Sequence, residues 1–481
     1  MLFNSIDFAI FLPIVFVLYW FVLSKNLKAQ NLLILISSYI FYSWWDWRFL
    51  SLIVFSSSID YFVGLALFNT DSSKKRKILL GISLLVNLGL LGFFKYFNFF
   101  IENFGNAFSF FGHDINSSRL NIILPIGISF FTFQTMSYTI DVYRRKLKPT
   151  KDVVSFFAFV SFFPQLVAGP IERATDLLPQ FYNRRKFESA RAKDGLRQFL
   201  LGLFKKIVIA DNAAIYVNDV FGHYQDYSGS TLFVGAILFT IQIYGDFSGY
   251  SDMAIGISRL FGFNLRQNFA FPYFSRDVGE FWRRWHITLS SWFRDYLYIP
   301  LGGSRVKTWT KIRNVFIIFL VSGFWHGANW TFIMWGFVNA LYFLPLMLRN
   351  KNRVHVNVSK VVAEGKYFPT FIEISQMIHV FFLTVIVRVF FRSETITQSF
   401  DILNKIFSYS FFNIPKKVSF FLITTILIYF LVEWVQRSKK HALQFDDINI
   451  PRYARFAFYY FIIFFIIWKG GNHQEFIYFQ F

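Results

Sequence analysis

Residues 1–21, MLFNSIDFAIFLPIVFVLYWF, contain a single charged side chain, that of Asp7. An apolar stretch of about 20 residues is long enough to cross the ~30 Å hydrocarbon layer of a bilayer as a helix. The stretch has no basic segment at its start and no small-residue cleavage site. We therefore expect a retained membrane span rather than a cleaved signal peptide.

Comparable apolar windows recur along the chain. Two regions, 153–169 and 312–348, have basic loops on both sides, and we expect re-entrant segments or paired half-helices there, with two full spans as the alternative for 312–348. The sequence predicts an all-α polytopic bundle of about ten to twelve spans, forming a single domain over residues 1–481. Full spans are expected near 6–23, 29–46, 49–68, 78–100, 122–141, 198–217, 231–249, 371–391, 418–436 and 455–468, the last of which is short.

Composition supports a membrane protein and excludes several kinds of chemistry. Only 16% of the 481 residues are charged, whereas soluble domains carry about a quarter. The chain has no cysteine, which rules out thiolate nucleophiles, disulfides and cysteine-bound metals. The sequence also contains no P-loop, no GxSxG elbow and no HExxH motif. We expect no metal site.

The formal net charge is +21, and its distribution indicates topology rather than nucleic-acid binding. Of the 49 lysines and arginines, 38 fall in alternate loops, as the positive-inside rule requires of cytoplasmic segments. This places both termini outside the cytoplasm. The loops concerned are 24–30, 70–77, 142–152, 170–197, 250–313, 349–370 and 437–455.

One histidine lies within an apolar region. His326 belongs to SGFWHGANWTFIMW, residues 322–335, where Trp325 and Trp330 flank it. An ionisable side chain at membrane depth is costly and marks a functional site by default. Burial would keep the imidazole neutral and available as a general base, and Asn329 is placed to hold one ring nitrogen. A structural histidine bonded to a neighbouring helix is the alternative.

A second histidine lies in a segment that mixes charge with aromatic residues. His286 belongs to WRRWHITLSSWFRDYLYIPLGG, residues 282–303. The aromatic residues follow helical spacing, which by itself is typical of an amphipathic helix at the membrane surface. Arginines also suit an anionic substrate, because the planar guanidinium binds two phosphate oxygens at once. The spacing does not decide between the two interpretations.

Two aspartates, Asp246 and Asp252, lie in YGDFSGYSDMAIG (244–256), near the inner end of a predicted span. We expect them to be solvated at the helix end or paired with arginines of the next segment. FFPQLVAGPIER (162–173) contains two prolines and a glycine, which predicts a turn.

In this order, these segments resemble the membrane-bound O-acyltransferase (MBOAT) family, in the branch that acetylates alginate. The resemblance runs almost end to end, with a signature core at about 122–350 and a C-terminal tail at 469–481. It rests on the segments already quoted together with FFKYFNFF (93–100), LPIGISFFTFQTMSYTIDVYR (124–144) and EFIYFQF (475–481).

The resemblance implies a helical bundle with a cytoplasmic and an outer funnel that meet at a narrow tunnel. It implies that His326 is the catalytic histidine and that His286 assists. It also implies an acetyl donor on the cytoplasmic side, either acetyl-CoA or an acyl-carrier protein, and no bound cofactor. The residues expected to line the donor site and tunnel are Arg283, Arg284, Trp285, Arg294, Asp295, Trp325 and Asn329.

The resemblance also implies a location and partners. We expect a multi-pass protein of the bacterial inner membrane that works with an extracytoplasmic SGNH-type acetyltransferase on a polysaccharide acceptor, alginate-like or peptidoglycan. Tyr478, in the tail, is a candidate acyl carrier, with membrane anchoring as the alternative. An exporter for D-alanylation-type modification and a non-catalytic transporter are the rival functions.

Overall fold

The computed structural model describes residues 1–112, 119–352, 354–358, 360–445, 451–470 and 474–477. The described residues form helices and connecting loops, with no strand among them. They divide into two compact units. Unit 1 comprises Met1–Gly195 and Ile257–Arg266, and unit 2 comprises Leu196–Gly256 and Gln267–Phe481.

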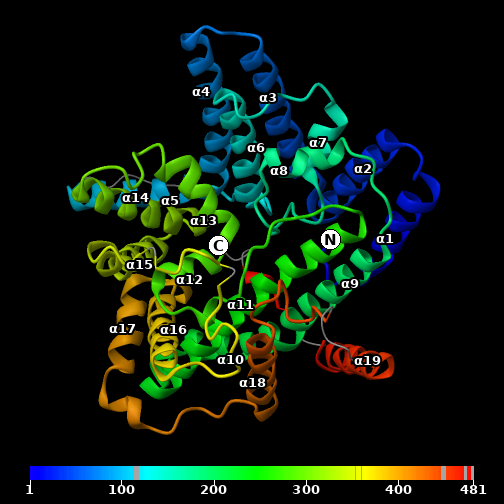
Figure 1. Ribbon diagram of the computed structural model, residues 1–481. Helices are drawn as coiled ribbons and strands as arrows, with labels where there is room; N and C mark the ends of the chain where they lie inside the picture. Colours follow the sequence, from blue (N-terminus) through cyan, green and yellow to red (C-terminus); the bar gives the residue numbers. More distant parts are fainter. Residues whose placement is uncertain (113–118, 353, 359, 446–450, 471–473, 478–481) are drawn as a thin grey trace. The chain divides into compact units, whose positions relative to one another are not determined.

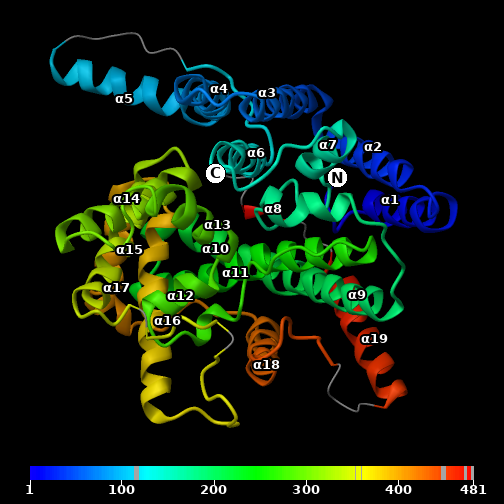
Figure 2. The same cartoon turned by 45° about the horizontal axis from the view of Figure 1, so that its top comes forward.

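Unit 1 contains the N-terminal helices, which Figures 1 and 2 show in blue to cyan-green. Its helices are α1 (Ile6–Val17), α2 (Leu27–Asp46), α3 (Leu50–Phe68), α4 (Ser73–Leu91), α5 (Phe97–Phe110), α6 (Ile128–Tyr143), α7 (Val153–Ser161), α8 (Ala174–Leu177) and the start of α9 (Ser189–Phe204).

A buried carboxylate links three helices of unit 1. The side chain of Asp60 on α3 is fully buried. It accepts hydrogen bonds from Ser83 and Asn87 on α4 and from Thr139 on α6, the last two at 2.8 and 2.9 Å. Hydrogen bonds between helices contribute to association in lipid, where apolar contact alone discriminates little. The chain leaves α7 after Ser161, as the prolines that follow predict.

Unit 2 contains both candidate catalytic histidines, His286 and His326. Its helices are α10 (Asp211–Gly222), α11 (Gly229–Leu260, which ends in unit 1), α12 (Val278–Arg284), α13 (Ile287–Phe293), α14 (Thr308–His326), α15 (Trp330–Leu348), α16 (Phe371–Arg392), α17 (Ile396–Ile406), α18 (Phe420–Val435) and α19 (Arg452–Lys469). A π-helical turn, Lys205–Ala210, joins α9 to α10.

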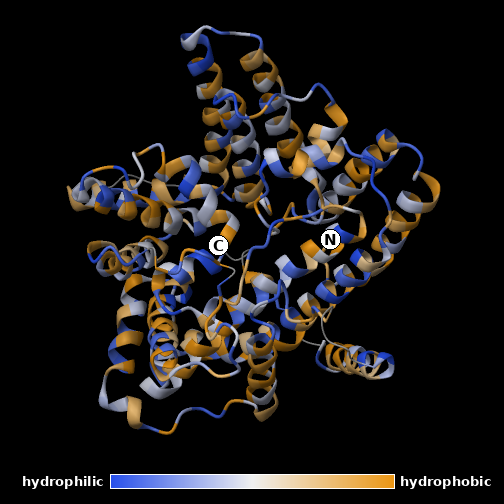
Figure 3. Ribbon diagram, in the orientation of Figure 1, coloured by the Kyte–Doolittle hydropathy of each residue, from blue (hydrophilic) through white to orange (hydrophobic). Residues whose placement is uncertain are grey.

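Within the described part of the chain, five helical segments are long and apolar enough to cross a membrane: Leu27–Phe68, Ser73–Phe110, Gly229–Leu260, Trp330–Leu348 and Phe371–Arg392. Many of their apolar side chains face outward; on α4, Leu85 is 75% exposed and Ile78 is 54% exposed. Figure 3 shows mainly hydrophobic residues along α3 and α4 and hydrophilic ones at the loop that joins them. Outward-facing apolar side chains of this extent fit a lipid environment. The protein is therefore a multi-pass membrane protein.

The region 312–348 forms two adjacent helices, α14 and α15, which pack closely against each other. Their backbones approach at glycines. A Cβ atom on Gly323 would lie 2.2 Å from the carbonyl oxygen of Phe332, and one on Gly336 would lie 2.3 Å from that of Phe319. Only glycine permits such close contact between helices. The close packing of α14 on α15 therefore fixes the position of the loop that joins them.

Candidate active site

His326 is the last residue of α14, where the helix stops before an extended Gly327. Asn329 then starts α15: its Oδ1 accepts a hydrogen bond from the backbone N–H of Thr331, and its Nδ2 donates to the carbonyl of Glu394, both at 2.9 Å. An asparagine in this N-cap position satisfies an otherwise unpaired helix N–H. The tight turn between the two glycine-packed helices therefore fixes the position of His326.

Aromatic rings surround His326, which is 5% exposed. The ring centroids of Trp325, Trp335 and Phe391 lie 5.0, 5.2 and 5.4 Å from that of the imidazole, all in edge-to-face or nearly perpendicular arrangements. Such an enclosure excludes water and lowers the local dielectric, which strengthens any electrostatic contact made inside it.

The segment around His286 differs from the predicted amphipathic helix. The chain breaks into α12 and α13 at His286, whose φ of 45° is left-handed, so the helical spacing does not continue through this residue. Asn268 stabilises the break: its backbone carbonyl accepts from the N–H of Ile287 and its Oδ1 accepts from the hydroxyl of Thr288, both at 2.9 Å. A strained backbone held by its surroundings is common at functional sites.

The break brings His286 next to His326. The two imidazole centroids lie 6.5 Å apart, and the His286 ring is 1% exposed, with the edge-on ring of Phe247 at 4.6 Å. Burial, with a smaller contribution from the neighbouring His326, holds the pKa of His286 well below its usual range. His286 is therefore a neutral imidazole near neutral pH.

A small cavity of about 20 Å³ adjoins His326. This is room for roughly one water molecule. Trp285, an expected lining residue, lies on it. Its lining comes from helices α11, α12, α14, α15 and α16 and from Trp285 after α12, and comprises Ile243, Phe281, Trp282, Trp285, His326, Trp335, Asn339, Thr384, Val387, Arg388 and Phe391.

A much larger cavity, of about 940 Å³, lies between α13, α14 and α15. Two of the expected donor-site residues, Arg283 and Arg294, line it, together with Arg305 and Lys311. None of the described residues that line it is acidic, and its other wall is apolar, with Ile318, Phe319, Phe343, Met347 and Leu348 among others. A cationic rim beside an apolar wall suits a ligand that carries both phosphate and hydrocarbon.

Trp282 packs between residues of these two cavities. Its ring lies 5.4 Å from that of Phe319, which lines the large cavity, and 5.6 Å from that of Trp335, which lines the small one. The indole itself belongs to the lining of the small cavity.

Arg284, Asp295 and Trp325, which were also expected to line the donor site or tunnel, are not among the lining residues of either cavity. Arg284 is buried and binds Glu280 at 2.9 Å, and it also donates to backbone carbonyls, so it holds α12 in place rather than lining either cavity. Asp295 forms an ion pair with the adjacent Arg294 at 2.7 Å. The ring of Trp325 lies 6.1 Å from His286 as well as against His326.

Three potential metal ligands, Asp277, Glu280 and His355, have ligand atoms within 4.8 Å of one another. Arginines already provide positive charge there, because Arg276 and Arg284 bind Glu280 at 3.0 and 2.9 Å. The cluster is a set of ion pairs that fixes the start of α12.

Asp246 is buried and Asp252 is partly buried, and both pair with lysines, so the expectation that they pair with arginines is wrong. Lys206 binds Asp246 and Asp211, both at 2.8 Å, and Lys205 binds Asp252 at 2.7 Å. The π-helical turn directs these consecutive lysines to separate carboxylates. The sequence did not predict this pairing. Both lysines and Asp246 lie within the apolar stretches expected to be spans near 198–217 and 231–249, and nothing in the sequence shows which carboxylate each lysine faces.

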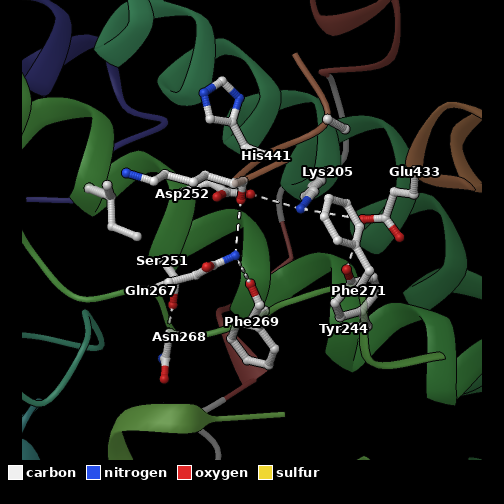
Figure 4. Close-up of a pocket in the computed structure, with 13 residues that line it drawn as sticks. Lys205, Tyr244, Ser251, Asp252, Gln267, Asn268, Phe269, Phe271, Glu433 and His441 are labelled. Atoms are coloured by element: carbon white, nitrogen blue, oxygen red, sulfur yellow. Dashed lines mark hydrogen bonds and ion pairs between the residues drawn. The ribbon is translucent and has the colours of Figure 1, made fainter. Parts of the chain in front are cut away.

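A second small cavity, shown in Figure 4, has a largely polar lining that includes Lys205 and its partners Asp252 and Glu433. Glu433 on α18 lies 3.7 Å from the Lys205 ammonium and accepts a hydrogen bond from Tyr244 at 2.8 Å. His441 also lines this cavity and is buried. This network ties α11 and α18 to the π-helical turn.

The C-terminal tail returns to the core of unit 2. The backbone N–H of Ile477 donates to Asp246 at 2.7 Å, and Lys206 donates to the carbonyl of Gln474 at 3.0 Å. Phe476 is buried, with its ring 6.3 Å from that of Phe247, the residue that packs on His286. Tyr478 lies outside the described residues.

Comparisons with known proteins identify the family of this chain. Residues 144–355 match the MBOAT family, described as the membrane-bound O-acyltransferase family. The chain is 39% identical over 414 residues to the probable alginate O-acetylase AlgI of Pseudomonas aeruginosa, covering 85% of this chain and 75% of that protein. It is 39% identical over 370 residues to the peptidoglycan O-acetyltransferase of Helicobacter pylori, covering 71% and 69%. A more distant relative, the teichoic acid D-alanyltransferase of Streptococcus thermophilus, is 32% identical over 45% of this chain and 55% of that protein.

Proposed function

Because this chain belongs to the membrane-bound O-acyltransferase family and is an O-acyltransferase, we propose that it moves an acetyl group from a cytoplasmic thioester across the membrane for O-acetylation of a cell-surface polysaccharide. Relatives named for alginate and peptidoglycan acetylation support a polysaccharide acceptor. The charge asymmetry of the loops supports a topology with both termini outside the cytoplasm.

The observation that carries the proposal is the pair of buried histidines, His326 and His286, 6.5 Å apart in an aromatic enclosure. His326 acts as the general base: it takes the proton from the attacking hydroxyl and returns it to the departing thiolate. His286 assists by orienting the reacting groups. A positioned base contributes about 10²–10⁴-fold to such a step.

The large cavity is the proposed donor site. Arg305 and Lys311 supply positive charge for the phosphates of coenzyme A or of a carrier-bound phosphopantetheine, and Arg283 and Arg294, which also bind backbone carbonyls and Asp295 respectively, add to the cationic rim. The apolar wall fits the pantetheine arm. Trp282, packed between this cavity and the one beside His326, is the proposed point where the thioester passes to the histidines.

Tyr478 is the proposed acyl carrier. Support comes from the tail, because residues 474–477 are held by Lys206 and Asp246, and the buried ring of Phe476 lies 6.3 Å from that of Phe247, which packs on His286. An extracytoplasmic SGNH-type acetyltransferase would then receive the acetyl group. Tyr478→Phe keeps the aromatic anchor and removes the hydroxyl, so polysaccharide acetylation at the wild-type level in that variant would eliminate the relay.

The proposed function is tested by acetyl transfer from ¹⁴C-labelled acetyl-CoA, with the full-length protein in proteoliposomes together with its partner transferase. His326→Ala is expected to lower the rate by about 10²–10⁴-fold at equal membrane abundance. His379→Ala is the matched control, because His379 lies on α16 but does not line the cavity beside His326. Wild-type activity of His326→Ala would refute the catalytic role.

A D-alanyl exporter is the second candidate, supported by the similarity to a teichoic acid D-alanyltransferase. The same proteoliposomes charged with D-alanyl carrier protein separate the two. Transfer of D-alanine but not of acetyl would favour the exporter, and transfer of neither, despite transport of another solute, would favour a transporter.

A further inference from the structure

Arg388 is a buried cation in α16 that sequence reasoning did not single out. Its side chain is 4% exposed, within a segment apolar enough to span the membrane. One guanidinium nitrogen, Nη1, donates to the carbonyl of Thr240 at 2.9 Å and to the hydroxyl of Tyr273. Among the residues that the structure describes, no carboxylate forms an ion pair with it. A buried charge without a counter-charge is costly, so its retention points to a function.

One face of α16 directs Arg388 into the cavity beside His326. Thr384, Val387, Arg388 and Phe391, spaced as one side of a helix, all line that cavity. The ring of Phe391 lies 5.4 Å from that of His326. Arg388 therefore lies one helical turn from the residue that packs on the proposed base.

Trp285 holds the guanidinium plane. The Arg388 Cζ atom lies 4.2 Å from the centroid of the Trp285 ring, a cation–π contact that is strong when desolvated. The Trp285 ring also stacks on that of Phe281, at a centroid distance of 5.7 Å and an interplanar angle of 16°. Because a guanidinium carries five N–H groups and Nη1 accounts for two, the Nε and Nη2 groups remain for a ligand, with no hydrogen bond to a described residue.

We propose that Arg388 is a further catalytic residue that binds the oxygen of the thioester carbonyl and stabilises the oxyanion formed from it. This rests on the proposed acetyl transfer. The acceptor hydroxyl oxygen bonds to the carbonyl carbon, the carbonyl π electrons move onto the oxygen beside Arg388, and His326 takes the hydroxyl proton. The carbonyl then re-forms, the carbon–sulfur bond breaks, and the thiolate takes the proton from His326.

The size of the cavity and the charge of Arg388 fit this role. A space of about 20 Å³ admits one oxygen-sized group and excludes bulk water. Preorganised donors act most strongly where charge develops in a dry site, and the loss of one such donor lowers the rate by about 10²–10³-fold. The guanidinium supplies a full charge that needs no reorganisation, because Trp285 and Thr240 already hold it.

The test uses Arg388→Ala in the proteoliposome assay. We expect the maximal rate to fall by about 10²–10³-fold, while the apparent KM for acetyl-CoA changes by less than about threefold, because the contact strengthens only in the transition state. Added methylguanidinium, which refills the space left by the side chain, is expected to restore the rate at least tenfold. A merely structural arginine would not give this rescue.

Arg392→Ala is the matched control, because Arg392 lies one turn further along α16, binds Asn218 and does not line the cavity beside His326; its activity is expected within about threefold of wild type. If Arg388→Ala does not accumulate in membranes, Arg388→Lys is measured in its place. Lysine keeps the positive charge but lacks the planar guanidinium, so this variant is expected to have a rate at least tenfold below that of wild type. Full activity of the folded alanine or lysine variant overturns the inference, as does a loss in the folded alanine variant that methylguanidinium does not rescue.

Wild-type protein and His326→Ala are measured alongside. If wild-type protein transfers acetyl, His326→Ala does not, and Arg388→Ala does, only the role of Arg388 fails. If wild-type protein with its partner transfers no acetyl group, the proposed function fails and this inference fails with it.

Discussion

Lys206 lies at the centre of a buried ion triad, and its removal should destabilise unit 2. The ammonium is 2.8 Å from both Asp211 and Asp246 and 3.0 Å from the Gln474 carbonyl, and its side chain is 7% exposed. Lys206→Met retains the hydrophobic stem and leaves two carboxylates without a counter-charge. Breaking a buried pair costs about 3–5 kcal/mol of unfolding free energy. At roughly 2 °C per kcal/mol for a unit of this size, the melting temperature falls by about 6–10 °C.

The assay is thermal unfolding of the full-length protein in detergent, followed by tryptophan fluorescence. Lys416→Met is the matched control, because Lys416 pairs with Asp219 at 2.5 Å but is 41% exposed, and an exposed pair contributes at most about 1 kcal/mol. Neutralising both aspartates in the Lys206→Met background, as Asp211→Asn and Asp246→Asn, is expected to restore much of the stability. Equal shifts for the two lysine variants would refute the reasoning.

Three further outcomes are expected. Gly336→Ala should reduce the amount of folded protein at a cost of about 1–3 kcal/mol, because its Cβ would meet the Phe319 carbonyl, whereas Gly81→Ala, with open space around it, should not; equal yields would contradict the packing. Because the folded pKa of His286 lies below the unfolded value of about 6.5, the unfolded state binds the extra proton, so stability should fall by about 1.4 kcal/mol per unit as pH drops below 6.5, and melting curves of His286→Gln should lack this component. Trp282→Ala should raise acetyl-CoA hydrolysis in the absence of acceptor, measured as free thiol release, because the indole packs between the large cavity and the cavity beside His326. An unchanged rate would show that Trp282 does not separate the two cavities.

Much of the fold follows from periodicity and composition. The apolar windows located most of the helices, and the region 312–348, expected to hold paired half-helices or two spans, contains α14 and α15. Length and hydropathy alone did not give the number of spans, because helices such as α11 run well beyond the apolar window that predicted them. Helix ends depend on packing and capping, which a window of hydropathy does not contain.

The candidate site was predictable in its residues but not in its geometry. The motifs single out His326 and His286, yet helical spacing predicted a continuous helix through His286. The left-handed backbone there depends on Asn268, some 18 positions away in the sequence. Arg388 was visible only as one basic residue in an apolar span, and its importance depends on the tertiary contact with Trp285. Long-range partners of this kind leave no local pattern.

The π-helical turn at Lys205–Ala210 has a consequence for how this protein can change over evolutionary time. Loss of one codon within it would rotate the following helix by about 100° relative to the preceding one, so that Lys205 and Lys206 could not both meet the carboxylates they now hold. A point substitution elsewhere in the helix changes one set of contacts at a time. A change of length at this turn would instead break, in a single event, the ion pairs with α11 and the hydrogen bond that holds the C-terminal tail. The length of this segment should therefore be more constant among descendants of the gene than its composition.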